Sequence, residues 1–108
     1  MYVIKANVND GVARELQTAL LALGVPRLRM TPVSGYTNGC EREIVYRGVR
    51  QAVALFPEIE LEVMACNEAV DDVVGAIIRT SRGLHGDGYV TVTPVDQCYR
   101  IRTGVREF

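Results

Sequence analysis

The feature that most constrains the fold of this chain is a strand–helix–strand pattern that occurs twice in 108 residues. In the first half, apolar and polar side chains alternate over residues 2–8, which predicts a strand. Residues 10–24 carry apolar side chains at helical spacing, which predicts a helix with Asp10 as its N-cap and Gly24 as its end. A second strand is predicted over residues 28–36.

The second half repeats this order. A strand is predicted over residues 59–64, a helix over residues 70–82 with Asn67 as its cap and Gly83 as its end, and a strand over residues 89–95. Two such units side by side make an α+β fold, a ferredoxin-like double β-α-β sandwich with both helices on one face. The residues expected to face the core are Val12, Leu16, Ala19, Leu20 and Leu23 from the first helix, and Val70, Val73, Val74, Ile77 and Ile78 from the second. The sheet face away from the helices is expected to show Lys5, Glu60, Glu62, Thr91 and Thr93.

Length and composition limit the function classes. We expect residues 1–108 to form a single domain, because the chain is long enough for one core but not for two. A formal net charge of −1 argues against a general nucleic-acid binder. The longest apolar run, residues 19–23, is too short to cross a bilayer, and no export signal is visible. Cys40, Cys66 and Cys98 are too far apart for a zinc or redox motif, so a reducing cytoplasm is the expected compartment.

Residues 37–50 separate the two halves and are rich in charge. They are expected to project into solvent as a long loop, because they offer no apolar face to bury. A recognition surface for a partner protein and a disordered connection are the alternatives for this segment. The charged residues of the expected recognition surface are Glu41, Arg42, Glu43, Arg47 and Arg50.

Two features near the C-terminus predict a site for a compact anion. Gly86 and Gly88 flank Asp87 in a tight turn, where glycines leave backbone N–H groups uncovered for phosphate oxygens. Arg100 and Arg102 alternate with an apolar residue, so on an extended strand both guanidinium groups would point the same way. An ordinary turn and a solvated edge strand are the plainer explanations of the same residues.

Several motifs in matching order resemble the PII signal-transduction protein family over essentially the whole chain. They are Val33-Ser34-Gly35-Tyr36, Val45-Tyr46-Arg47-Gly48, Phe56-Pro57-Glu58-Ile59-Glu60-Leu61-Glu62-Val63, Ile77-Ile78-Arg79-Thr80, Gly86-Asp87-Gly88 and Arg100-Ile101-Arg102-Thr103-Gly104. The resemblance implies a homotrimer that binds adenine nucleotides in clefts between subunits and contacts partner proteins through the long loop. Carried over residue by residue, it implies that the nucleotide meets Gly35, Tyr36, Val63, Met64, Gly86, Asp87 and Gly88, with Arg100 and Arg102 reaching it from the neighbouring subunit.

The chain departs from the PII pattern at four positions. Tyr89 replaces a lysine that meets nucleotide phosphates in many members, which favours ADP or AMP over ATP. Gly39 replaces a glutamine that helps to hold magnesium, and Glu58 replaces a lysine that meets 2-oxoglutarate. Gln51 replaces the tyrosine that is nucleotidylated in many bacterial members. These departures indicate a divergent subgroup, of the kind associated with inorganic-carbon handling, bicarbonate transport, carboxysome gene clusters or metal efflux.

The resulting expectation is a non-catalytic regulatory protein without a cofactor or bound metal. Its second ligand would be a small anion such as bicarbonate, held by backbone N–H groups from Gly35 to Asn38, which includes Tyr36 and Thr37. Its protein partner would be a transporter or a carboxysome-related protein. The alternatives are a weak nucleotide hydrolase, for which no catalytic constellation is visible, and a metal-responsive protein, for which grouped ligands are lacking. His85 and Cys40 are interpreted as a solvated side chain and a bystander thiol.

Overall fold

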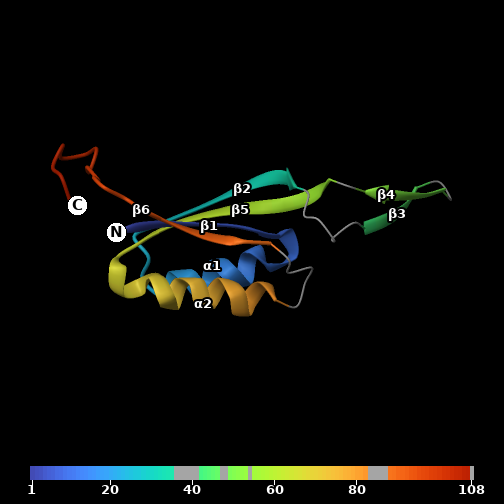
Figure 1. The fold of residues 1–108 in the computed structure, drawn as a ribbon, viewed down its shortest axis with the longest axis horizontal. Helices are drawn as coiled ribbons and strands as arrows, with labels where there is room; N and C mark the ends of the chain where they lie inside the picture. The colour runs from blue at the N-terminus through green and yellow to red at the C-terminus, as the bar shows by residue number, and fades with distance from the viewer. Residues whose placement is uncertain (36–41, 47–48, 54, 83–87, 108) are drawn as a thin grey trace.

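The computed structural model describes residues 1–35, 42–46, 49–53, 55–82 and 88–107. Its centre is a four-stranded sheet in the order β2-β5-β1-β6. The strands are β1 (Tyr2–Asn9), β2 (Arg27–Gly35), β5 (Phe56–Ala65) and β6 (Val90–Pro94), and each neighbouring pair is antiparallel. Both α1 (Ala13–Ala22) and α2 (Val70–Ser81) lie on one face of this sheet (Figure 1). The expected ferredoxin-like double β-α-β sandwich is therefore confirmed.

The helix starts differ from the sequence expectation. Each α-helix is preceded by a short 3-10 helix, Asp10–Val12 before α1 and Asn67–Ala69 before α2. Asn9, not Asp10, supplies the capping side chain, because its Oδ1 accepts a hydrogen bond from the Gly11 backbone nitrogen at 2.8 Å. Asn67 does not cap α2, since its Oδ1 accepts a hydrogen bond of 2.7 Å from the N-terminal ammonium of Met1.

The core lies between the sheet and the two helices. The predicted stripes are confirmed at most of their positions, and two end members differ: Leu23 and Ile78 are each 40% exposed. Leu23 lies just beyond the end of α1, and Ile78 lies in the final turn of α2. The buried cluster consists of Ile4, Ala6, Val8, Val12, Leu16, Leu20, Leu61, Val63, Ala65, Val73, Ala76 and Ile77.

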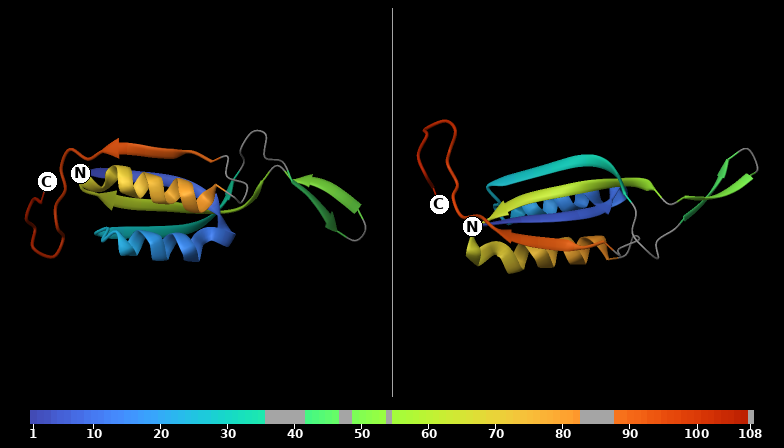
Figure 2. Two further views of the ribbon diagram at one scale, coloured as in Figure 1. Left: turned by 90° about the horizontal axis from the view of Figure 1, so that it is seen from below. Right: turned by 45° about the horizontal axis from the view of Figure 1, so that its top comes forward.

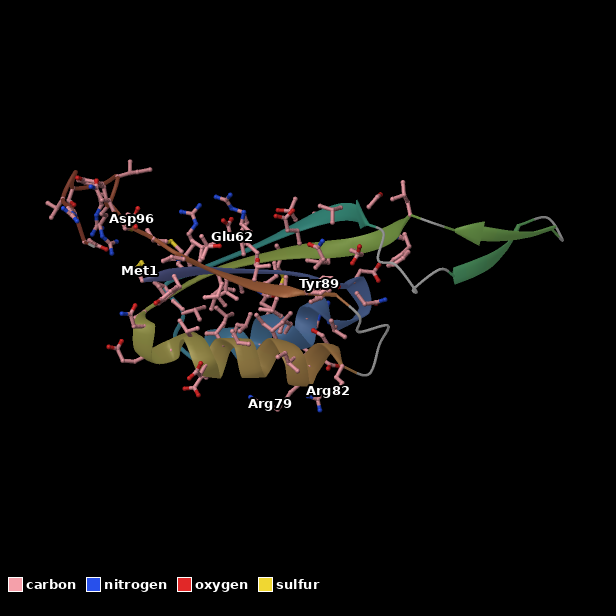
Figure 3. The ribbon with its side chains drawn as sticks, in the orientation of Figure 1. Met1, Glu62, Arg79, Arg82, Tyr89 and Asp96 are labelled. Carbon is pink, nitrogen blue, oxygen red and sulfur yellow. The ribbon has the colours of Figure 1, made fainter. Side chains whose placement is uncertain are left out.

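The opposite face of the sheet is polar, as expected. Lys5, Thr91 and Thr93 are exposed there, and Glu60 and Glu62 are half-buried. Arg29 on β2 forms an ion pair with Glu62 on β5, with 3.5 Å between guanidinium nitrogen and carboxylate oxygen. Strand register places Lys5 beside the same glutamate. The side chains of this face are drawn in Figure 3, where Glu62 is labelled.

The segment between the two halves contains regular structure, so the expectation of a loop over residues 37–50 is corrected. β3 (Arg42–Tyr46) and β4 (Val49–Val53) form an antiparallel hairpin, which continues beyond residue 50. The hairpin extends from the sandwich at the end where β2 stops and β5 begins, which makes the molecule elongated, 58 × 25 × 22 Å (Figures 1 and 2). The described part of this segment, residues 42–46 and 49–50, thus lies outside the sandwich.

Within the described ranges, neither α1 nor α2 is long and apolar enough to cross a membrane.

Candidate functional site

The predicted ligand residues lie at two opposite ends of the sandwich. Gly35 and Gly88 lie at what we call the hairpin end, where β1 and β2 stop and β5 and β6 begin. Met64, Arg100 and Arg102 lie at the terminal end, beside both chain termini (Figures 1 and 2). One chain by itself therefore does not bring together the two groups of residues that were expected to share a phosphate.

Several predicted positions fall outside the described residues. They are Tyr36, Thr37, Asn38, Glu41, Arg47, Gly86 and Asp87, together with His85 and Cys40. Arg42 and Glu43 lie on β3 and Arg50 lies on β4, so three of the five expected recognition residues belong to the projecting hairpin.

Gly88 is required by a close approach between two strands. A Cβ atom at this position would lie 2.7 Å from the backbone oxygen of Asn7 on β1. Among the described glycines, positive φ angles occur at Gly24 and Gly104, not at Gly88. Gly88 therefore meets a need for space beside β1, and not a need for left-handed backbone.

Gly35 accommodates a buried carboxylate. A Cβ atom at Gly35 would lie 1.5 Å from Oε1 of Glu58 on the neighbouring strand β5. The Glu58 residue is 7% exposed, although it lies on the polar face of the sheet. The strand register places it between Asn9 on β1 and Val33 on β2. The Glu58 carboxyl group thus lies at the root of the projecting hairpin, at the position where the PII resemblance implies a lysine.

A small hollow lies next to Gly88. It has a volume of about 120 Å³ between the ends of β1 and α2 and the start of β6. Ile77 and Val90 contribute to its apolar lining, while Arg82 and Tyr89, both labelled in Figure 3, lie at its polar margin. The hydroxyl of Ser81, another lining residue, is buried and has no hydrogen-bond partner within the described residues.

At the terminal end the chain reverses direction, so the predicted strand that carries Arg100 and Arg102 is a turn. The Gly104 nitrogen donates to the Arg100 oxygen at 2.8 Å, and the Arg100 nitrogen donates to the Val105 oxygen at 3.0 Å. Gly104 has a φ of 68°, which glycine adopts without strain. The two arginines are therefore not displayed along one face of an extended strand.

Arg100 is held by a residue that sequence reasoning missed. Its Nε donates to Oε1 of Glu107, and its second guanidinium nitrogen donates to Oε2 at 3.2 Å. The hydrogen bond and the charge of Glu107 raise the pKa of Arg100, and the hydrogen bond from Arg100 lowers the pKa of Glu107. The reversal at Thr103-Gly104 was the sequence signal that could have placed residues 100 and 107 together.

A second hollow, of about 270 Å³, separates this turn from the sandwich. Met64 lines it together with Arg100, whereas the Val63 side chain is fully buried in the core. The remaining lining residues are Met1, Pro26, Arg27, Cys98, Tyr99, Ile101 and Glu107.

Cysteine and metal chemistry receive no support from the described part of the chain. Cys66 and Cys98 are both free thiols, and Cys66 is exposed. No group of three or more His, Cys, Asp and Glu side chains within these residues could hold a metal ion.

Comparison with known proteins points to one family. The sequence model of the family described as "Nitrogen regulatory protein P-II" matches residues 1–105. A protein of that name from Rhizobium etli is 34% identical over 105 residues, which cover 96% of this chain and 94% of the relative. Relatives of the same name and the same coverage are 35% identical in Cereibacter sphaeroides and 32% identical in Haemophilus influenzae.

Proposed function

The chain belongs to the PII family of regulatory signal-transduction proteins, and on this basis we propose that it binds an adenine nucleotide in the clefts of a homotrimer. The observation that carries the proposal is the separation of Gly35 and Gly88 from Arg100 and Arg102 at opposite ends of one chain. A phosphate can meet both groups when the hairpin end of one subunit lies against the terminal end of the next. The split therefore supports a site that two subunits share.

The nucleotide we propose is AMP or ADP in preference to ATP. Tyr89, which replaces a phosphate-binding lysine of many relatives, is 80% exposed beside Gly88 and brings no positive charge. Fewer phosphates need less neutralisation, so a site without this lysine suits the shorter nucleotides better. PII proteins are in general regulatory and not enzymes, and we propose the same for this chain; weak nucleotide hydrolysis is the alternative.

We further propose that the second ligand is a small anion such as bicarbonate and not 2-oxoglutarate. The buried carboxylate of Glu58 beside Gly35 would repel a dicarboxylate at the root of the hairpin. A small anion needs only backbone N–H groups of residues 35–38. The conformation of the projecting β3–β4 hairpin would then depend on which ligands are bound, and a cytoplasmic partner protein would bind the hairpin in one of these conformations. Our candidate for this partner is a transporter or a carboxysome-related protein.

Calorimetry with AMP, ADP and ATP, each with and without bicarbonate, tests the proposal. Replacing both Arg100 and Arg102 by alanine should weaken nucleotide binding by at least about thirtyfold, because charge-assisted hydrogen bonds to phosphate are lost. The matched control replaces Arg14 and Arg79, two exposed arginines on the helices, and should bind as the wild type does. Equal affinity in the Arg100/Arg102 variant, or micromolar 2-oxoglutarate binding with magnesium and ATP, would contradict the proposal.

A further inference from the structure

The C-terminal turn places Glu107 against Arg100 through backbone hydrogen bonds. The Glu107 nitrogen donates to the Cys98 oxygen at 2.7 Å, and an antiparallel bridge joins Tyr99 to Arg106. Residues 98 and 107 are therefore paired across the turn, with Arg100 two positions further along. On a paired ladder, such diagonal neighbours lie within reach of long side chains. The contact between the two side chains thus follows from the local fold of the turn.

The contact occupies one edge of the Arg100 guanidinium group. Two of its nitrogens donate to the two carboxylate oxygens of Glu107, the fork-to-fork arrangement that guanidinium also makes with phosphate. The side chains are 51% and 42% exposed, so water can reach both partners. An ion pair with this exposure is weak and readily exchanged for another anion.

We propose that the carboxylate of Glu107 competes with a nucleotide phosphate for the guanidinium group of Arg100. In the free protein the carboxylate of Glu107 takes the place of a phosphate oxygen pair, and the arriving nucleotide displaces it into solvent. This inference rests on the proposed nucleotide site, and it adds a residue that sets the affinity of that site. The fraction of ligand-free molecules in which Arg100 is not paired with Glu107 sets the apparent affinity for the nucleotide. The smaller this fraction is, the further the apparent affinity lies below the intrinsic affinity.

The surroundings of the pair indicate what the competition discriminates. Arg27 lines the same hollow, so a second cation lies near the place that a ligand phosphate would take. A weakly bound anion would not displace Glu107, whereas a ligand that also gains contacts to neighbouring groups would. Glu107 therefore prevents free inorganic phosphate from binding to Arg100. It favours a phosphate group that is part of a larger ligand.

Glu107→Gln and Glu107→Ala variants test the competition by titration calorimetry with ADP and with inorganic phosphate as probes. Either change should tighten ADP binding about two- to fivefold, the range expected when a weak exposed ion pair is removed. Glu15→Gln is the matched control, since it removes one exposed negative charge on α1 away from the turn. Each Glu107 change is also made in an Arg100→Ala background, where it should alter ADP affinity no more than Glu15→Gln does, because no guanidinium is left to release.

The outcomes separate this inference from the proposed function. Tighter ADP binding that depends on Arg100, together with measurable phosphate binding in the Glu107 variants alone, supports the competition. Unchanged or weaker ADP binding in both variants, with the wild type still binding ADP, overturns the competition and leaves the nucleotide site intact. If neither the wild type nor the Glu107 variants bind any adenine nucleotide, the proposed function fails and the competition fails with it. Thermal melting of each variant checks that the fold is retained.

Discussion

Among single residues, Gly35 and Gly88 each lie close to an atom of another strand. Both glycines are predicted ligand contacts, because glycine lets backbone come close to a ligand. The structure adds a packing role: Gly35 leaves room for the Glu58 carboxylate, and Gly88 leaves room for the Asn7 backbone oxygen. Both neighbours lie on other strands, so the contacts depend on register, which no pattern within either glycine's own segment reveals.

Replacing Gly88 by alanine should lower the stability of the fold. The new Cβ would lie 2.7 Å from the Asn7 oxygen, and this atom belongs to backbone held in β1. We expect a loss of about 1–3 kcal/mol in the free energy of unfolding, the usual effect of overpacking, measured by urea denaturation. Gly75→Ala on α2 is the control, because its Cβ would meet only the mobile end of Arg79, at 3.0 Å, and alanine favours the helix. Equal stability of the two variants would show that the β1–β6 approach is not tight.

Among elements, the repeated strand–helix–strand order was predictable and two irregular-looking segments were not. The charges around Arg42 and Arg50 indicate a solvent-exposed loop and so mask the hairpin pattern. Two runs of β-prone residues, Ile44–Tyr46 and Val49–Val53, stand on either side of Arg47-Gly48, and a two-residue connection with glycine is a hairpin signal. The alternation of Arg100 and Arg102 with Ile101 predicts a strand, although the reversal that follows at Thr103-Gly104 decides their geometry.

The β3–β4 hairpin should respond to ligands more than the helices do. Its strands pair with each other and form a sheet of their own. Ligand contacts at the root of the hairpin can therefore change which hairpin conformations are populated without disturbing the sandwich. We expect amide hydrogen exchange over residues 42–46 and 49–53 to slow when ADP and bicarbonate are bound, with little change in α1 and α2. Exchange that is identical with and without saturating ligands would mean that the hairpin is not the output of the protein.

At the scale of the whole molecule, the single chain leaves apolar side chains exposed at its terminal end. Ile101 is 98% exposed, Val105 is 58% exposed and Tyr99 is 55% exposed. These residues surround the same turn that carries the predicted phosphate-binding arginines. Burial against a second subunit would remove this apolar surface from water and would bring Arg100 to a neighbouring hairpin end. The proposed assembly would thus account for both the exposed apolar residues and the separation of the predicted ligand residues.

A complementation experiment tests whether two subunits share the ligand site. One variant carries Arg100→Ala with Arg102→Ala, which impairs the terminal end. The other carries Gly86→Asp, a negative charge in the predicted phosphate-binding turn at a position outside the described residues. Each variant alone should bind ADP weakly, because every cleft then lacks one half of its site. In a closed ring of three subunits, each mixed trimer has one cleft in which both halves are intact.

Co-expressed variants, purified by two different tags, should therefore regain wild-type affinity for ADP at about one cleft per mixed trimer. Trimers of each variant purified separately and mixed just before the measurement are the control, and they should regain binding only as fast as subunits exchange. If mixed trimers form but bind ADP as weakly as the parent variants do, each ligand site lies within a single chain. The division between the hairpin end and the terminal end would then have no functional meaning, and the nucleotide would have to meet one of the two groups without the other.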